Sequence, residues 1–201
     1  MRFKATLSPE SVSLLHDLLT PLARLSSSKA SDRDASWLRN GSLLRLDPES
    51  LVIVCQAKSP DCDGISCYAK LNSEMFLEHR IESRENNAIV MELDLAQFRQ
   101  ALSTTLQQVC SLKLAKRNGV PSLCLEAMST VQVHHAIPVR MRKDNPERMA
   151  APALSAPVAS MHLPRSKPLR SIVEQIKQRE GKDVYLSASP RTGELTVVWQ
   201  G

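Results

Sequence analysis

The sequence predicts an α+β protein in which antiparallel strands form sheets and helices cover one face of them. Twice, a strand-like segment leads directly into an amphipathic helical pattern, at residues 2–25 and 89–109. Short alternating segments separated by turn residues surround these helices, which is typical of antiparallel strands. After a Pro- and Ala-rich segment the order strand, helix, strand, turn, strand begins again, so we expect a second, incomplete unit of the same kind.

The first strand and helix follow from a change of hydrophobic period. Residues 2–7 alternate apolar and polar side chains, as a half-buried strand does. Ser8 is a suitable N-cap and Pro9 suits the first helical turn. The expected apolar stripe of this helix consists of Leu15, Leu18, Leu19, Leu22 and Leu25. Because proline removes one backbone hydrogen bond, Pro21 is expected to kink the helix or end it early.

The Ser- and Asp-rich residues 26–41 predict a solvated loop. Four strand-like segments follow it, and their regular spacing predicts an antiparallel meander. These segments are residues 42–47, 51–57, 65–71 and 76–82.

A second strand followed by a capped amphipathic helix is predicted at residues 89–109. A strand at Ile89–Leu93 leads to Asp94, an N-cap with Gln97 three residues later, which is a capping-box arrangement. The helix is expected to bury Leu95, Phe98, Leu102, Leu106 and Val109. Three strands should follow, at residues 111–116, 122–128 and 131–141, with a tight hairpin turn at Asn118-Gly119.

The Pro- and Ala-rich segment predicts a division into domains. We expect a first domain at residues 1–141, a connector at 142–157 and a partial second domain at 158–201. The second domain should contain a strand, a helix and two further strands. These are residues 159–164, about 168–180, 183–188 and 194–200.

Positive charge gathers in the second half of the chain. Residues 1–110 carry 12 basic and 14 acidic side chains, whereas residues 111–201 carry 14 and 7, respectively. The polar side of the helix at 168–180 carries Arg170, Lys177 and Arg179, with Arg165 and Lys167 just upstream. Such a face suits an acidic polymer, although a surface helix also carries Lys and Arg for solubility alone.

No pattern of residues indicates catalysis, a metal or a cofactor. His134 and His135 are adjacent, so on a strand they point to opposite faces. The five cysteines lack the short spacings of zinc sites and are odd in number, which favours free thiols in a reducing compartment. No apolar run approaches the roughly eighteen residues that a membrane span needs. We therefore expect neither an enzyme nor a membrane-spanning protein.

Several segments, in this order, resemble the Hus family of checkpoint clamp subunits. They are MRFKA, ENNAIVMELDLAQFRQAL, LKLAKRNGVPSLCLE, HHAIPVRM, MHLPRSKPLRSIVEQIK and GELTV. The resemblance covers nearly the whole chain except residues 26–41 and the connector. It implies the sliding-clamp fold of proliferating cell nuclear antigen, with sheets outside, helices on one face and the second clamp domain incomplete.

The resemblance also implies a function that involves binding and no catalysis. Three different clamp subunits form the nine-one-one ring in the nucleus. The ring encircles double-stranded DNA without reading its sequence, and repair and checkpoint proteins dock on its outer face. The helices line the hole. The DNA-facing residues implied here are Arg24, Arg99, Arg165, Lys167, Arg170 and Lys177.

Clamp subunits join edge to edge, which implies a subunit interface on the last strand of the first domain. Its expected residues are Val131, Val133, His135, Ile137 and Val139. Pro138 would interrupt the donors of this edge. The matching strand of the second domain is expected after Gly201, so this chain should not close a ring. A truncated clamp product or interaction module that binds one partner subunit remains an alternative, as does an enzyme on an α+β fold.

Overall fold

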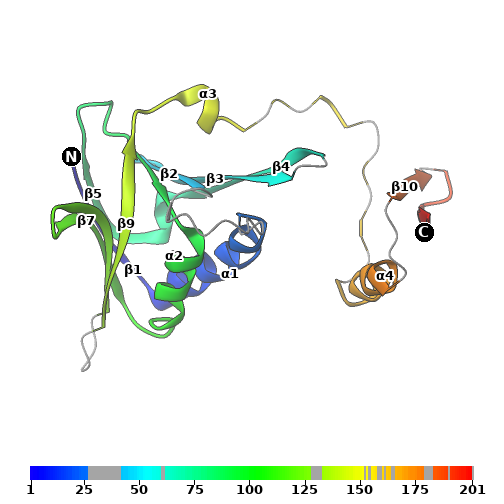
Figure 1. Ribbon diagram of the computed structural model, residues 1–201, viewed down its shortest axis with the longest axis horizontal. Helices are drawn as coiled ribbons and strands as arrows, with labels where there is room; N and C mark the ends of the chain where they lie inside the picture. The colour runs from blue at the N-terminus through cyan, green and yellow to red at the C-terminus, as the bar shows by residue number, and fades with distance from the viewer. Residues whose placement is uncertain are drawn as a thin grey trace. The chain divides into compact units, whose positions relative to one another are not determined.

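The chain forms two compact units, residues 1–151 and 152–201, which are described separately (Figure 1). The computed structural model describes residues 1–26, 42–59, 62–127, 133–151, 153, 155–157, 160, 162–163, 166–178, 183–189 and 191–200. The predicted loop at 26–41 lies outside these residues, apart from Ser26, which ends the first helix. The predicted boundaries of the domains and the connector stay a prediction.

The first unit is built on a nine-stranded antiparallel sheet. Its strands are β1 (Arg2–Leu7), β2 (Ser42–Leu46), β3 (Ser50–Ser59), β4 (Cys62–Asn72), β5 (Phe76–Glu82), β6 (Ile89–Leu93), β7 (Cys110–Arg117), β8 (Val120–Ala127) and β9 (His134–Arg142). They are arranged in the order β4-β3-β2-β6-β9-β8-β7-β1-β5. All the strands predicted in this region are present, and Asn118 and Gly119 form the β7–β8 turn with φ of +50° and +81°.

Strand β9 joins the two halves of this sheet. Its first residues, His134–Pro138, pair with β8, whereas Val139–Arg142 pair with β6. Pro138 is the last residue that pairs with β8, so it lies where the strand changes partner. A proline is tolerated there because it has no N–H to donate and each half of β9 pairs on one side.

The meander prediction is correct for three strands and wrong for the fourth. Strands β2, β3 and β4 are consecutive neighbours, but a short 3-10 turn, η1 (Ser73–Met75), leads β5 to the opposite edge, where it pairs with β1. The Phe76 ring packs edge-on against Phe3, with ring centroids 6.3 Å apart. Alternation predicts a strand but not its partner, since pairing depends on contacts between residues distant in sequence.

Helix α1 (Pro9–Ser26) begins as predicted but does not end at Pro21. The Ser11 N–H donates to the Ser8 hydroxyl oxygen at 3.2 Å, which caps the helix. Pro21 is exposed, so the Asp17 carbonyl that lost its usual donor lies on the solvent side. The helix therefore continues for another turn.

Helix α2 (Leu95–Ser103) is capped by Asp94, whose carboxylate accepts hydrogen bonds from the Ala96 and Gln97 N–H groups at 2.8 and 3.3 Å. The Gln97 side-chain amide donates to that carboxylate, and its oxygen does not accept the Asp94 N–H, so the reciprocal half of a capping box is missing. The helix ends six residues before the predicted Val109. Thr104 and Thr105 donate their hydroxyls to carbonyls of the last turn, which favours termination.

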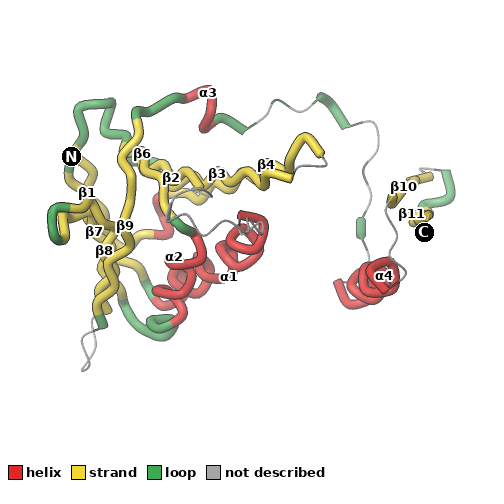
Figure 2. The backbone as a smooth tube through the Cα atoms, in the orientation of Figure 1, coloured by secondary structure: helices red, strands yellow, loops and turns green. Residues whose placement is uncertain are grey.

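Both helices lie on the same face of the sheet and contact each other (Figures 1 and 2). The core between helices and sheet is continuous. Its largest fully buried side chains are Phe98, Leu7, Leu15, Leu19, Leu44, Leu46, Leu51, Ile53, Ile89, Met91, Leu93 and Leu95. The opposite face of the sheet carries exposed polar side chains such as Arg2, Lys4 and Arg80, together with the buried Val52 and Val90.

A short helix, α3 (Pro146–Met149), follows β9 inside the predicted connector. Asn145 precedes it and accepts the Glu147 N–H at 3.1 Å through its side chain. The sequence Asn-Pro is a recognisable helix start, so this helix could have been predicted. Its Met149 side chain is buried.

The second unit contains helix α4 (Ser166–Gln178) and a hairpin of β10 (Asp183–Ser189) and β11 (Glu194–Gln200). The helix begins two residues before the predicted Pro168. The strand expected at 159–164 is absent from its described residues, Ser160, His162 and Leu163. No described helix of the chain is long and apolar enough to cross a membrane.

Candidate nucleic-acid interface

The helical face of the first unit carries little positive charge. Exposed positions on α1 recur every three or four residues and consist of Glu10, Leu14, Asp17, Pro21 and Arg24. Two carboxylates and one guanidinium make this stripe slightly acidic. Arg24 is exposed in the last turn, where the helix dipole favours a cation.

Helix α2 adds an uncharged surface. Its exposed residues are Ala96, Gln97, Gln100 and Ser103, with Thr104 at the C-cap. Arg99 is half-buried, so it presents less of its guanidinium than a fully exposed cation would. Arg24 and Arg99 thus supply a sparse set of cations on a helical face that also carries the carboxylates Glu10 and Asp17.

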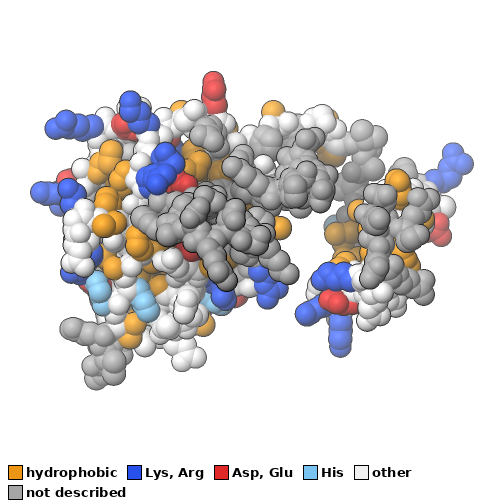
Figure 3. Space-filling view, viewed as in Figure 1, with side chains coloured by type: hydrophobic (Ala, Val, Ile, Leu, Met, Phe, Trp, Pro, Cys, Tyr) orange, Lys and Arg blue, Asp and Glu red, His pale blue; other side chains and the backbone are white. Residues whose placement is uncertain are grey.

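Helix α4 carries the densest group of exposed cations among the predicted DNA-facing residues. Lys167, Arg170 and Lys177 are all exposed, and Lys and Arg side chains gather on this helix in Figure 3. Lys177 lies 4.0 Å from the Glu174 carboxylate, an exposed pair that contributes little. Lys167 and Arg170 form no ion pair with any described residue. Arg165 and Arg179 lie outside the described residues.

The basic face of α4 is separate from its apolar stripe. Leu169, Ile172, Val173 and Ile176 follow the helical repeat on another side, and none of them is buried; Val173 is 48% exposed. When an apolar stripe of this kind packs on a sheet, the basic face turns outward. An outward row of exposed cations can bind phosphate groups without reading bases.

The residues of the predicted subunit interface lie on β9 or just before it, and the interface itself stays a prediction. Ile137 and Val139 are 3% and 2% exposed and belong to the core, and Val133 packs against it. Val139 also pairs with β6, so β9 is not an edge strand along its length. Among the described residues, the sheet edges are β4 and β5. In the described part of the chain, the backbone of His134–Pro138 has a strand partner on the β8 side alone.

The two neighbouring histidines contact different elements, as strand alternation predicts. His135 is half-buried, and its Nε2 lies 2.8 Å from the Thr104 hydroxyl at the end of α2. His134 Nδ1 lies 3.0 Å from the Glu126 carboxylate. Val131, the remaining predicted interface residue, lies outside the described residues. No group of three described His, Cys, Asp or Glu side chains could hold a metal ion.

A charged cluster beside this segment was not predicted. The Glu126 carboxylate contacts three basic side chains. The Lys113 ammonium lies 2.6 Å from it and the Arg117 guanidinium 3.9 Å, and His134 is the third. The hydrogen bond from Lys113 lowers the pKa of Glu126, with the nearby positive charges as a further cause. These residues come from the three adjacent strands β7, β8 and β9. Their spacing in the sequence therefore does not predict that they contact one another.

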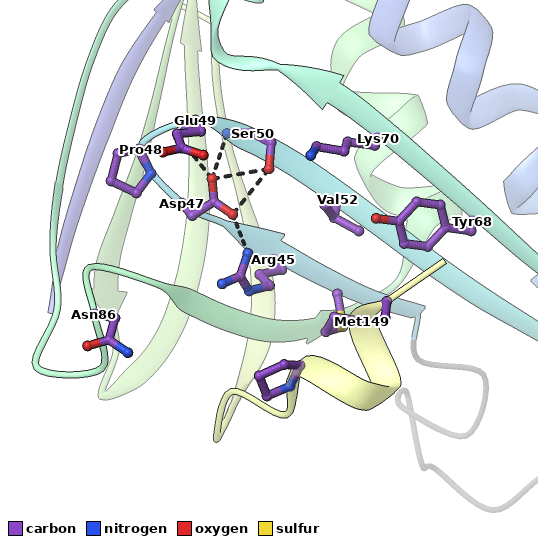
Figure 4. Close-up of a pocket in the computed structure, with 12 residues that line it drawn as sticks. Arg45, Asp47, Pro48, Glu49, Ser50, Val52, Tyr68, Lys70, Asn86 and Met149 are labelled. Atoms are coloured by element: carbon purple, nitrogen blue, oxygen red, sulfur yellow. Dashed lines mark hydrogen bonds and ion pairs between the residues drawn. The ribbon is translucent and has the colours of Figure 1, made fainter. Parts of the chain in front are cut away.

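A cavity of about 490 Å³ lies between the β2–β3 turn, β4 and α3 (Figure 4). Arg45 lies at its centre, where its Nε is 3.1 Å from Asp144 and its guanidinium also pairs with Asp47. The hydrogen bond to Asp144 raises the pKa of Arg45. Tyr68 and Met149 line the same cavity. Arg45 therefore ties the turn of one hairpin to the segment that follows β9.

We predict that Arg45→Ala lowers the free energy of unfolding by about 1–3 kcal/mol, because two largely buried carboxylates each lose the charged donor that they share. The side chains of Asp47 and Asp144 are each 15% exposed. Urea denaturation measures this loss. Arg80→Ala is the matched control, since its pair with Glu82 is exposed and should cost less than about 1 kcal/mol. Equal losses for the two variants would contradict the prediction.

Comparison with known proteins gives three consistent matches. A family model described as Hus1-like protein matches residues 1–200. Checkpoint protein HUS1 from Homo sapiens is 30% identical over 149 residues, which are 67% of this chain and 51% of the human protein. The crystal structure of PCNA from Thermococcus kodakaraensis matches 98% of this chain and 72% of that chain, with a TM-score of 0.50 and 18% identity.

At this low identity the structural match bears on the fold, and it confirms the predicted sliding-clamp fold. The chain spans about half the length of the curated relative it matches.

Proposed function

Because the chain belongs to the Hus1-like family, we propose that it is a non-catalytic subunit of a ring-shaped checkpoint clamp. In this proposal two other clamp subunits complete the ring, which encircles double-stranded DNA in the nucleus and recruits repair and checkpoint proteins. The family match and the clamp fold support the proposal. The chain's own contribution is a set of helices that face the duplex.

The observation that carries the DNA contact is the basic face of α4. Lys167, Arg170 and Lys177 are exposed on the side of the helix away from its apolar stripe. Cations on a rigid helix neutralise phosphates irrespective of base sequence, which suits a protein that must move along DNA. Arg24 and Arg99 supplement this contact from α1 and α2. A contact between Arg165 and DNA stays a prediction from the sequence.

Salt dependence of DNA binding tests this contact. With three phosphate contacts, the logarithm of the association constant should fall against the logarithm of salt concentration with a slope of about −3. Fluorescence anisotropy with two duplexes of unrelated sequence measures both slope and selectivity. We expect equal affinities for the two duplexes. A slope near zero, or strong preference for one sequence, would reject phosphate binding by α4.

Subunit contact is proposed at the backbone of His134–Pro138. Pro138 pairs with Ser122 but cannot donate a hydrogen bond, so its nitrogen is best accommodated on the open side of β9. By alternation the N–H groups of Ala136 and His134 then point to the same open side. A strand of a neighbouring subunit could pair there.

Ala136→Pro is predicted to weaken binding to a partner clamp subunit at least tenfold, because it removes a donor from the open side. Ala136 is exposed, so its side chain is not part of the core. Isothermal titration with each of the two expected partner subunits measures the effect, and circular dichroism checks the fold. Unchanged affinity for both partners would place the subunit interface elsewhere.

The neutral face of α1 and α2 favours a second candidate, a module that binds one partner subunit without gripping DNA. Two carboxylates on α1 would face the phosphates in the first proposal, which weakens that contact. The two candidates differ in one result. The interaction module would bind a partner subunit with no salt-dependent DNA affinity.

Partner proteins of the clamp are proposed to dock near the cavity at Arg45. The cavity is open to solvent on the polar face and is bordered by α3 in the predicted connector. Tyr68 and Met149 offer apolar contacts beside the exposed Lys70. A short peptide with one apolar anchor and acidic neighbours would match these groups.

A further inference from the structure

Two cysteines occupy directly opposite positions on the hairpin of β3 and β4. Cys55 is the register partner of Cys67. Opposite residues of an antiparallel pair point to the same face, so both thiols lie on the core side. Cys55 is 1% exposed, whereas Cys67 is partly exposed and packs against the core. Both are free thiols.

The ladder holds these residues at a separation that a disulfide can bridge. Opposite Cα atoms in an antiparallel pair lie about 4.5 or 5.5 Å apart, and a disulfide accepts about 4.4–6.8 Å. Their Cβ atoms, about 4.5–5.5 Å apart, need a small approach to reach the 3.5–4.5 Å of a disulfide. Strand β4 is an edge of the sheet, so it can make this approach without breaking a second ladder.

The other cysteines lack such a partner. Cys110 is opposite Ala127, and Cys124 lies between Lys113 and Ala136 in the ladder. Cys62 is opposite Ser59 near the end of the same hairpin. Within the described residues, Cys55 and Cys67 are therefore the cysteines that the fold places in register.

We propose that Cys55 and Cys67 form a redox-active pair that glutathione disulfide converts to a cross-strand disulfide. The Cys67 thiolate attacks one glutathione sulfur, forms a mixed disulfide and expels the first glutathione. The Cys55 sulfur then attacks Cys67 Sγ, forms the protein disulfide and expels the second glutathione. Two protein thiols are oxidised, one glutathione disulfide is reduced, and the two cysteine protons end on the two departing glutathiones.

The different burial of the two thiols explains why Cys67 reacts before Cys55. Burial, followed by the neighbouring Cys67, raises the pKa of Cys55 to about 11, so Cys55 carries little thiolate at neutral pH. The thiolate is the attacking species in thiol–disulfide exchange. The partly exposed Cys67 therefore meets glutathione disulfide first. Cys55 reacts second, when the sulfur that it attacks is already beside it.

The cross-link would fix an edge of the sheet. Strand β4 is held by its pairing with β3, and α1 packs on β3. A bond between Cys55 and Cys67 would keep β4 from detaching. The inference rests on the geometry of the hairpin and is independent of the proposed clamp function.

Peptide mapping tests the proposal directly on the full chain. The chain is incubated with glutathione disulfide, its remaining thiols are alkylated with iodoacetamide, and it is digested with trypsin. Cleavage after Lys58 places Cys55 on peptide 46–58 and Cys67 on peptide 59–70. We expect these two peptides joined, and separated by dithiothreitol. Recovery of Cys55 fully alkylated after the incubation would overturn the proposal.

Peptide 59–70 also contains Cys62, so two matched variants identify the bonded cysteine. Cys67→Ser should abolish the joined peptides, and Cys62→Ser should leave them unchanged. The partly exposed side chain of Cys67 makes its serine variant a mild change, and Cys67→Ala provides a second version. Joined peptides that persist in both Cys67 variants would overturn the assignment.

Discussion

Replacing Lys167, Arg170 and Lys177 together with alanine is expected to lower the affinity for duplex DNA roughly a hundredfold or more at about 0.1 M salt. Each lost phosphate contact removes about 0.9 from the slope of log affinity against log salt. The three side chains are exposed on one helix, so their removal leaves no cavity. Fluorescence anisotropy over a salt series measures both the affinity and the slope.

A charge-matched control separates a local contact from the effect of net charge. Arg2, Lys4 and Arg80 lie on the polar face of the sheet, opposite the helices, and are exposed. Their triple replacement by alanine removes the same charge and should change the slope by less than one contact. If both triple variants bind DNA equally weakly, the α4 face has no special role.

The largest effect on stability is expected from Phe98→Ala. Phe98 is 0% exposed and lies in α2, at the centre of the core between helices and sheet. Removing a buried phenyl ring loses its transfer free energy and leaves a cavity, at a cost of about 3–5 kcal/mol. Urea denaturation followed by far-ultraviolet circular dichroism measures the free energy of unfolding.

Gln100→Ala is the control on the same helix, because Gln100 is exposed and two residues away. Its effect should stay within about 0.5 kcal/mol. A loss below 1 kcal/mol for Phe98→Ala would mean that α2 does not pack on the sheet as described.

Local features of the fold were predictable from the sequence, and long-range features were not. The caps at Ser8 and Asp94 and the turn at Asn118-Gly119 depend on neighbouring residues, and all three are present. The placement of β5 beside β1 depends on Phe76 meeting Phe3, which lies 73 positions away in the sequence. The early end of α2 depends on two threonine hydroxyls that compete with the helix.

In the candidate site, too, local features could be predicted from the sequence and long-range contacts could not. The basic face of α4 follows from helical spacing, and Lys167, Arg170 and Lys177 are exposed on it. The sequence could not show that Val139 pairs with β6, which confines the open side of β9 to His134–Pro138. Nor could it show the Arg45–Asp144 contact or the Glu126 cluster, because residues far apart in sequence meet there.

Cross-linking to DNA tests most directly whether α4 faces the duplex. A photo-reactive amino acid replaces Glu174, which lies among the basic residues of α4, and in a second variant it replaces Glu78, exposed on β5. Both substitutions leave every cation in place. We predict cross-links to duplexes of any sequence from position 174 and none from position 78. Cross-links from position 78 without any from position 174 would contradict the account.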